Sequence, residues 1–243
     1  MAGLGLRPGD GFVAVGTGAQ VVRVLSEPRV DDSLRTHTFA TAGEIGQGWY
    51  RLGAIQSAGL VLTSVLRWLD ATPQDAAAAL RQGVSAADPI FVPYLSGERT
   101  PFMSSRLRGS WHRLSLSTDR AAMLRSVLEG VAQAIALGVD AVRDSGQPLP
   151  DTVPLIGGGS HDPEFRQLLA NATGLSLTVT DAPDSAVVGA ALLATGRTAN
   201  SRAVSGFEAV APQVGAARLL RDRRAMMVAY AQSSLQPRTE ESS

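Results

Sequence analysis

The residues best placed to do chemistry in this 243-residue chain lie in two glycine-rich turns. In the first, Gly157-Gly158-Gly159-Ser160 follows the short apolar run 153–156, which predicts a buried strand. Asp162-Pro163-Glu164 then has the composition of a helix start, with Asp162 as the N-cap and proline at the first helical position. Glycines between a strand and a helix let a ligand approach the backbone, and the amides there can point at a nucleotide.

The charge of this helix start decides which end of a nucleotide it suits. Asp162 and Glu164 place negative charge there, so we expect the adenosine end at this turn and the terminal phosphates elsewhere. The alternative is a tight strand-to-helix turn without a ligand, because a glycine-rich turn is by itself a weak signal.

The second turn, Gly16-Thr17-Gly18, lies between two runs rich in β-branched residues within 11–25. This pattern predicts a hairpin whose turn needs glycine backbone angles. The turn amides and the Thr17 hydroxyl could hold phosphate oxygens. Taken alone, the stretch is better explained by an ordinary hairpin turn.

Composition excludes several classes of chemistry. The 22 basic and 22 acidic residues balance, so nothing indicates a nucleic-acid or membrane-surface partner. Every basic residue is arginine, which excludes a phosphate-loop lysine and a Schiff base. The chain has no cysteine, and His37, His112 and His161 are scattered, so no zinc motif is indicated. No apolar run reaches transmembrane length and Arg7-Pro8-Gly9-Asp10 interrupts any signal peptide, so we expect a cytoplasmic protein.

The order of the predicted elements indicates an α/β fold. Strand-like segments come first, within 11–25 and 37–54, and strands then alternate with helices. This order predicts a mixed sheet with helices on its faces, in a single domain over 1–243. Helices are expected from about 59, and over 74–81, 118–144, 186–195 and 215–235. The polar tail, 236–243, is expected to be disordered.

Two sets of charged residues have competing interpretations. The segment 95–111 contains Glu98, Arg99, Arg106 and Arg108, and it is too polar for a core and too long for a simple turn. It is either an internally salt-bridged surface loop or a loop folded over an active-site cleft. In the longest predicted helix, Glu129 is interpreted as half of a structural ion pair. The neighbouring glycine at 130 indicates close packing against another element.

Several stretches, in order and spacing, resemble the C-terminal half of the FGGY carbohydrate kinases. They are PYLSGERTP at 93–101, the GTG hairpin, SAG at 57–59, EGVA at 129–132, the GGG turn with FRQ at 165–167, and VGAALLA at 188–194. The PYLSGERTP form is most similar to xylulokinases.

The resemblance implies an actin-like, ribonuclease-H-like ATPase domain. It also implies transfer of the γ-phosphoryl group of ATP to a sugar hydroxyl, with Mg²⁺. The GTG hairpin would face the phosphates, the GGG turn would line the adenosine, and the SAG segment would pack on the other side of the nucleotide. The residues that the resemblance assigns to the nucleotide are Gly16, Thr17, Gly18, Ala58, Gly59, Gly158, Gly159, Ser160 and Asp162.

The chain departs from the family at its start. In the family a first domain supplies most of the sugar pocket, and an Asp general base precedes the segment that matches 1–6. Here Asp10 is the first carboxylate, and it follows that segment. We therefore expect a nucleotide-binding half that is inactive without a first-domain partner and holds no catalytic residue of its own. The alternative is a non-catalytic, self-associating interaction module or a truncated kinase remnant. In either case we expect a homo-oligomer, formed through the surface that a first domain would cover.

Overall fold

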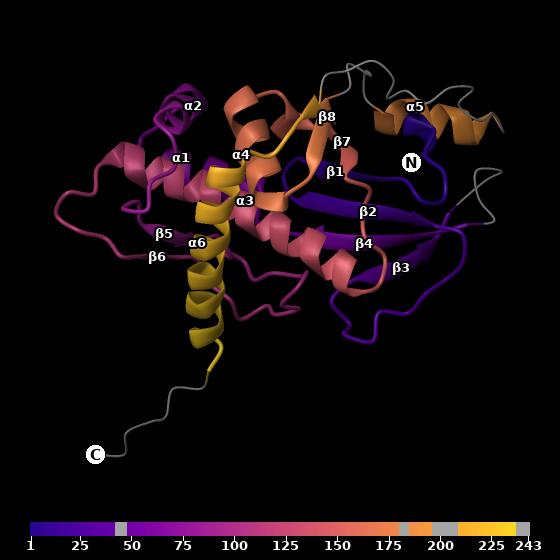
Figure 1. The fold of residues 1–243 in the computed structure, drawn as a ribbon, viewed down its shortest axis with the longest axis horizontal. Coiled ribbons are helices and arrows are strands. Elements are labelled where there is room, and N and C mark those ends of the chain that lie inside the picture. The colour runs from indigo at the N-terminus through magenta and orange to yellow at the C-terminus, as the bar shows by residue number, and fades with distance from the viewer. Residues whose placement is uncertain (42–47, 180–184, 196–208, 237–243) are drawn as a thin grey trace.

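A seven-stranded sheet forms the centre of the computed structural model, which describes residues 1–41, 48–179, 185–195 and 209–236 (Figure 1). The strand order is β3-β4-β2-β1-β7-β8-β9. β1 pairs in parallel with β7 and β7 with β8, whereas the other pairs are antiparallel, so the predicted mixed sheet is confirmed. The strands are β1 (Gly11–Val15), β2 (Ala19–Leu25), β3 (His37–Ala40), β4 (Trp49–Ile55), β7 (Thr152–Ile156), β8 (Ser176–Val179) and β9 (Ala209–Val210), with β5 (Ile90–Val92) and β6 (Ser110–His112) as a separate pair.

The helices follow the predicted segments closely. They are α1 (Gly59–Trp68), α2 (Pro73–Arg81), α3 (Arg120–Asp144), α4 (Pro163–Thr173), α5 (Ser185–Ala194) and α6 (Val214–Ser233), with short 3₁₀ turns η1 (Ala2–Leu4) and η2 (Gly158–Ser160). The helix predicted from 118 begins two residues later, because the Asp119 side chain caps it by accepting a hydrogen bond from the Ala122 amide at 2.7 Å. The helix predicted over 186–195 is α5, and the tail from 237 lies outside the described residues.

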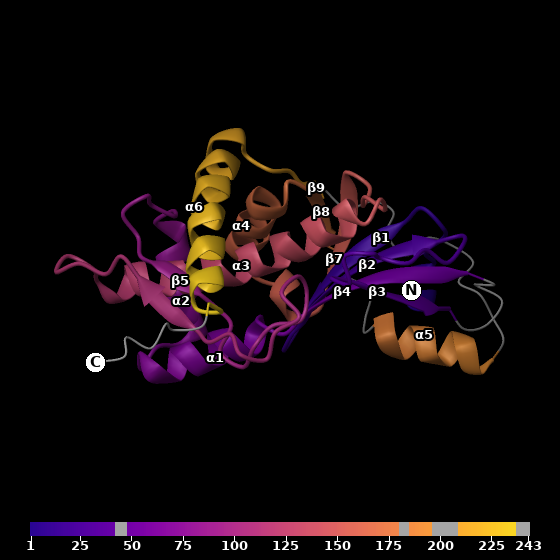
Figure 2. The same ribbon diagram turned by 90° about the horizontal axis from the view of Figure 1, so that it is seen from below.

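The two faces of the sheet bury different side chains, as the strand alternation requires. On β1, Val13 and Val15 join the main core, which includes Ile135 of α3. Phe12 of the same strand joins a second cluster on the opposite face, with Leu4 of η1. Figure 2 shows α3 and α5 on opposite sides of the strands. Helices therefore cover both faces, as predicted.

The central helix α3 is long and apolar enough to cross a membrane by length and composition, but 89% of its apolar window is buried inside the fold. It is thus the core helix of this structure. A Cβ on Gly130 would lie 2.6 Å from the Phe91 carbonyl oxygen, so the predicted close packing at this glycine is confirmed. The predicted ion pair of Glu129 is also confirmed, since its two carboxylate oxygens each accept a hydrogen bond from Arg223 at 2.7 Å.

Candidate functional site

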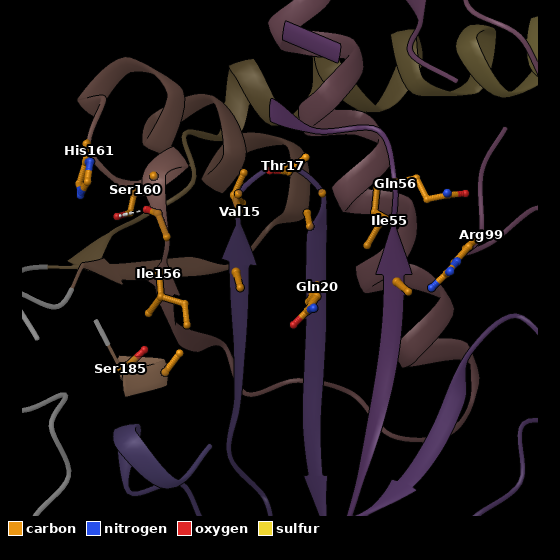
Figure 3. A pocket seen from close by; sticks show the side chains of 18 residues that line it. Val15, Thr17, Gln20, Ile55, Gln56, Arg99, Ile156, Ser160, His161 and Ser185 are labelled. Carbon is orange, nitrogen blue, oxygen red and sulfur yellow. Dashed lines mark hydrogen bonds between the residues drawn. The ribbon is translucent and has the colours of Figure 1, made fainter. Parts of the chain in front are cut away.

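Three strands end at the same edge of the sheet, and a cavity opens there. β1 and β7 are parallel, and β4 runs in the same direction because both β1 and β4 are antiparallel to β2. Ligands of open α/β sheets bind outside the carboxyl ends of such strands. The cavity, which we call the polar cavity, has a volume of about 680 Å³ (Figure 3). It is lined by Ala14, Val15, Gly16, Thr17, Gly18, Ala19, Gln20, Ala54, Ile55, Gln56, Arg99, Ile156, Gly157, Gly158, Ser160, His161, Ser185 and Ala186.

A second cavity of about 350 Å³ adjoins the first and shares Val15, Gly16 and Gly158 with it. Its walls are mainly apolar side chains of α1, α2, α3 and α4, so we call it the apolar cavity. The lining residues are Val15, Gly16, Ala58, Gly59, Leu62, Thr63, Pro73, Ala76, Ala77, Leu80, Leu128, Val131, Gly158, Gly159, Asp162 and Phe165. Apolar walls with a few polar groups suit a planar organic group, and the polar cavity next to it suits hydrophilic substituents.

The structure brings the sequence-predicted residues together at these two cavities. Those lining the polar cavity are Gly16, Thr17, Gly18, Gly158 and Ser160. Those lining the apolar cavity are Gly16, Ala58, Gly59, Gly158, Gly159 and Asp162. The GTG hairpin, the SAG segment and the GGG turn are far apart in sequence, and the sheet makes them neighbours.

The GTG turn between β1 and β2 is tied to the start of α1. The Gly16 amide donates to the Gly18 carbonyl at 2.8 Å, and the Gly59 amide donates to the Gly16 carbonyl at 3.0 Å. A Cβ on Gly59 would lie 2.5 Å from that Gly16 oxygen, so only glycine fits there. Thr17 at the turn is exposed, which leaves its hydroxyl accessible from the polar cavity.

The three glycines after β7 have different roles. A Cβ on Gly157, whose φ is +86°, would lie 2.5 Å from the Val15 carbonyl oxygen, and one on Gly159 would lie 2.6 Å from Val15 Cγ1. The absence of a side chain at these two positions lets the turn pack against β1. For Gly157 and Gly159, a tight strand-to-helix turn therefore explains the glycine. A Cβ on Gly158 would meet nothing within 4 Å. Of the three, Gly158 is therefore the one at which an added side chain would enter open space, and it lines both cavities.

Two polar side chains of this turn are engaged within it. The buried Ser160 hydroxyl donates to the Gly157 carbonyl at 2.7 Å. The Asp162 side chain accepts a hydrogen bond from the Phe165 amide at 2.8 Å, which confirms it as the N-cap of α4. Asp162 is the single carboxylate among the described residues that line the two cavities. It stabilises the start of α4 and belongs to the apolar cavity. The described lining of the polar cavity contains no acidic residue.

The loop 95–111 supplies a residue that the sequence did not single out. The interpretation of 95–111 as an internally salt-bridged surface loop is wrong. All residues of this loop are described, and no ion pair joins two of them. Glu98 is instead buried, and its carboxylate accepts hydrogen bonds from the amides of Gln56 at 2.7 Å, Ser57 at 3.2 Å and Arg99 at 2.7 Å. Burial raises the pKa of Glu98, and these hydrogen bonds oppose that rise. Arg99 lines the polar cavity, as the cleft interpretation of the loop requires.

The magnesium ion implied by the resemblance finds no cluster of protein ligands here. In the described part of the chain, no group of three or more His, Cys, Asp or Glu side chains could hold a metal ion. Among the described residues, the polar cavity is lined by neither Asp nor Glu, which are the side chains that Mg²⁺ prefers. The described residues thus do not form a magnesium site of their own.

Comparison with known proteins places this arrangement in a family. The model of the C-terminal domain of the FGGY family of carbohydrate kinases matches residues 11–196. The xylulose kinase of Escherichia coli (strain K12) is 37% identical over 162 residues, which are 65% of this chain and 33% of that protein.

Solved structures give the same result for the fold. A protein described as a xyloylose kinase from Brucella ovis superposes with a TM-score of 0.85 at 28% identity, over 97% of this chain and 50% of that one. A ligand-bound xylulose kinase from Lactobacillus acidophilus superposes with a TM-score of 0.82 at 21% identity, over 96% and 49%. This chain thus spans about half the length of these structures, and the predicted actin-like, ribonuclease-H-like fold is confirmed. Since the family model covers most of its residues, the chain belongs to the FGGY family of carbohydrate kinases, as a C-terminal domain.

Proposed function

We propose that residues 1–243 act as one domain, the nucleotide-binding half of an ATP-dependent sugar kinase with xylulokinase-like activity. The observation that carries this proposal is the pair of adjoining cavities that meet at Gly158. The apolar cavity takes the adenosine, and the polar cavity takes the phosphates beside the GTG turn. This division agrees with the negative charge at the start of α4, which suits the adenosine end better than a phosphate.

The proposed reaction is the transfer of the γ-phosphoryl group of ATP to a sugar hydroxyl, in the cytoplasm, where ATP is available. Enzymes of this kind act mainly by positioning the two reactants and by stabilising the charge on the transferred group. In this chain, the turn amides and the Thr17 hydroxyl orient the phosphates. Because Gly18 and Gly59 have no side chain, the turn can pack closely against the end of β4 and the start of α1, which holds it in place.

The acceptor side of the reaction is proposed to need a further domain. The single carboxylate among the described residues lining either cavity, Asp162, caps α4 and is not positioned to accept a proton from a sugar at the polar cavity. The relatives named above are also longer than this chain. We therefore propose that the 243 residues bind ATP and ADP, and transfer the phosphoryl group only when a first-domain partner supplies the sugar pocket and the base.

Calorimetry and a coupled kinase assay test both parts of this proposal. The purified chain should bind ADP, and with ATP, Mg²⁺ and xylulose it should release no ADP above the buffer rate. A Gly158→Val variant prepared in the same way controls for contaminating kinases, whose activity would persist in it. Absence of ADP binding contradicts the nucleotide site. Turnover that is present in the parent and absent in the variant contradicts the need for a partner.

A second candidate, self-association, is favoured by the surface of α5. This helix is composed of Ser, Ala, Val, Gly and Leu, and η1 packs against it. Val187 is 63% exposed, Val188 39% and Leu193 43%, although a helix that is apolar all round is normally buried. The contact with η1 is close, since a Cβ on Gly3 would lie within van der Waals overlap of the Ser185 carbonyl oxygen. A second copy of the chain covering η1 and α5 would bury this surface.

Light scattering tests this candidate directly. We expect a species larger than the 25.3 kDa monomer at micromolar concentration, and a Val188→Asp variant that is monomeric. Val214→Asp is the matched control, because Val214 is 88% exposed and lies at the start of α6. A monomeric parent, or a Val188→Asp variant with an unchanged mass, rules out α5 as the contact.

A further inference from the structure

The polar cavity has an unusual balance of charge for a site that takes an anion. Arg99 is the single arginine among its described lining residues, that lining contains no carboxylate, and the chain has no lysine. Figure 3 shows Arg99 on one side of the cavity and Ser160 and His161 on the other, across the ends of the strands. Among the described lining residues, Arg99 is therefore the one permanent positive charge that a polyphosphate in this cavity would contact.

The Arg99 guanidinium is not neutralised by the acid next to it in sequence. The Glu98 carboxylate is 2% exposed and is occupied by the backbone amides of Gln56, Ser57 and Arg99 itself. Within the described ranges, no hydrogen bond or ion pair joins the Arg99 guanidinium to another side chain. An exposed arginine that has its neighbouring acid engaged elsewhere is available to a ligand.

The backbone at Arg99 is fixed to the end of β4. The Thr100 amide donates to the Ala54 carbonyl at 2.9 Å, and the Ala54 amide donates to the Thr100 hydroxyl oxygen at 3.0 Å. The same hydroxyl donates to the Arg35 carbonyl at 2.7 Å, and Thr100 is fully buried. Because Glu98 and Thr100 are both anchored, the Arg99 side chain projects from a rigid base. Such preorganisation lowers the entropic cost of binding.

We infer that Arg99 binds the β- and γ-phosphate oxygens of the nucleotide, and that Glu98 is a positioning residue that holds it there. The guanidinium is planar and can donate two parallel hydrogen bonds to phosphate oxygens, which makes arginine well suited to the task. The inference rests on the proposed nucleotide site and adds to it the group that recognises the charged end. Recognition of the adenosine, in the apolar cavity, should not involve Arg99.

Calorimetry with two probes, adenosine and ADP, tests the inference in the full chain. Arg99→Gln should weaken ADP binding about tenfold or more, as expected for the loss of a charged hydrogen bond, and leave adenosine binding unchanged. The matched control is Arg106→Gln, because Arg106 is exposed in the same loop and lines neither cavity. That variant should bind both probes like the parent.

Two further measurements separate charge recognition from structural damage. Arg99→Lys, which keeps the charge, should recover part of the ADP affinity. Added salt should reduce the preference of the parent for ADP over adenosine, with little effect on the preference of Arg99→Gln. Equal loss of both probes in Arg99→Gln, or unchanged ADP binding, overturns the inference; unchanged ADP binding leaves the nucleotide site intact. A parent chain that binds neither probe overturns the proposed function itself.

Discussion

Replacing Gly158 with valine should abolish detectable ADP binding and leave the stability of the fold nearly unchanged. A Cβ at this position meets no heavy atom within 4 Å, and the residue lines both cavities where they join. The valine side chain would therefore fill space that the nucleotide needs, without displacing protein atoms. Calorimetry with ADP and a thermal melt of the same sample measure the two effects.

The control for this variant is the same substitution at another open glycine. A Cβ on Gly215 in α6 would also meet nothing within 4 Å, and this residue lines neither of the two cavities. Gly215→Val should bind ADP like the parent. ADP affinity that is unchanged in Gly158→Val would remove Gly158 from the site. Gly159→Val is the less informative choice, because its Cβ would lie 2.6 Å from Val15 Cγ1 and β1 would have to shift.

Replacing Glu129 with leucine should destabilise the fold by about 3–5 kcal/mol, because it leaves a buried arginine without its counter-charge. Arg223 is 1% exposed, and its guanidinium donates to both oxygens of Glu129 at 2.7 Å. It also donates to the carbonyls of Asp88 at 3.0 Å and Pro89 at 2.8 Å. The ion pair thus joins α3, α6 and the segment that leads into β5. Urea unfolding measures the loss.

Two comparisons identify the cause of that loss. The double variant Glu129→Leu with Arg223→Met should be more stable than Glu129→Leu alone, since it removes both buried charges together. Glu27→Ala breaks an exposed pair with Arg29, 2.9 Å long, and should cost no more than about 1 kcal/mol. If Glu129→Leu is as mild as Glu27→Ala, the buried pair does not stabilise the junction of α3 and α6.

Local sequence rules were sufficient for the features that depend on neighbouring residues. Asp162 is predictable as an N-cap because an aspartate side chain reaches the amide three residues ahead, as it does in the structure. The GTG hairpin was predictable for the same reason, since a turn and its flanking strands are contiguous. The ion-pair role of Glu129 was predictable from its place in a core helix. Its partner, Arg223, lies 94 residues away, and no local rule indicated it.

The features that the sequence left open depend on contacts between distant segments. Arg99, Arg106 and Arg108 are equivalent by composition, and only Arg99 lines the polar cavity. Its position follows from the hydrogen bond that the Glu98 carboxylate accepts from the Gln56 amide, 42 residues away. Likewise, Gly158 differs from the glycines on either side only because the parallel pairing of β7 with β1 places those two against Val15.

In the proposed nucleotide site, the shared wall at Gly158 would make the two cavities a bivalent receptor for one ligand. A molecule that occupies both cavities loses its translational freedom once, and its second group then binds at a high effective concentration. In the same proposed site, free inorganic phosphate or a free purine base would occupy only one cavity, and each would lose its full translational entropy for half of the contacts. The backbone at Gly158, which carries no side chain to separate the cavities, is the feature that makes this chelate effect available.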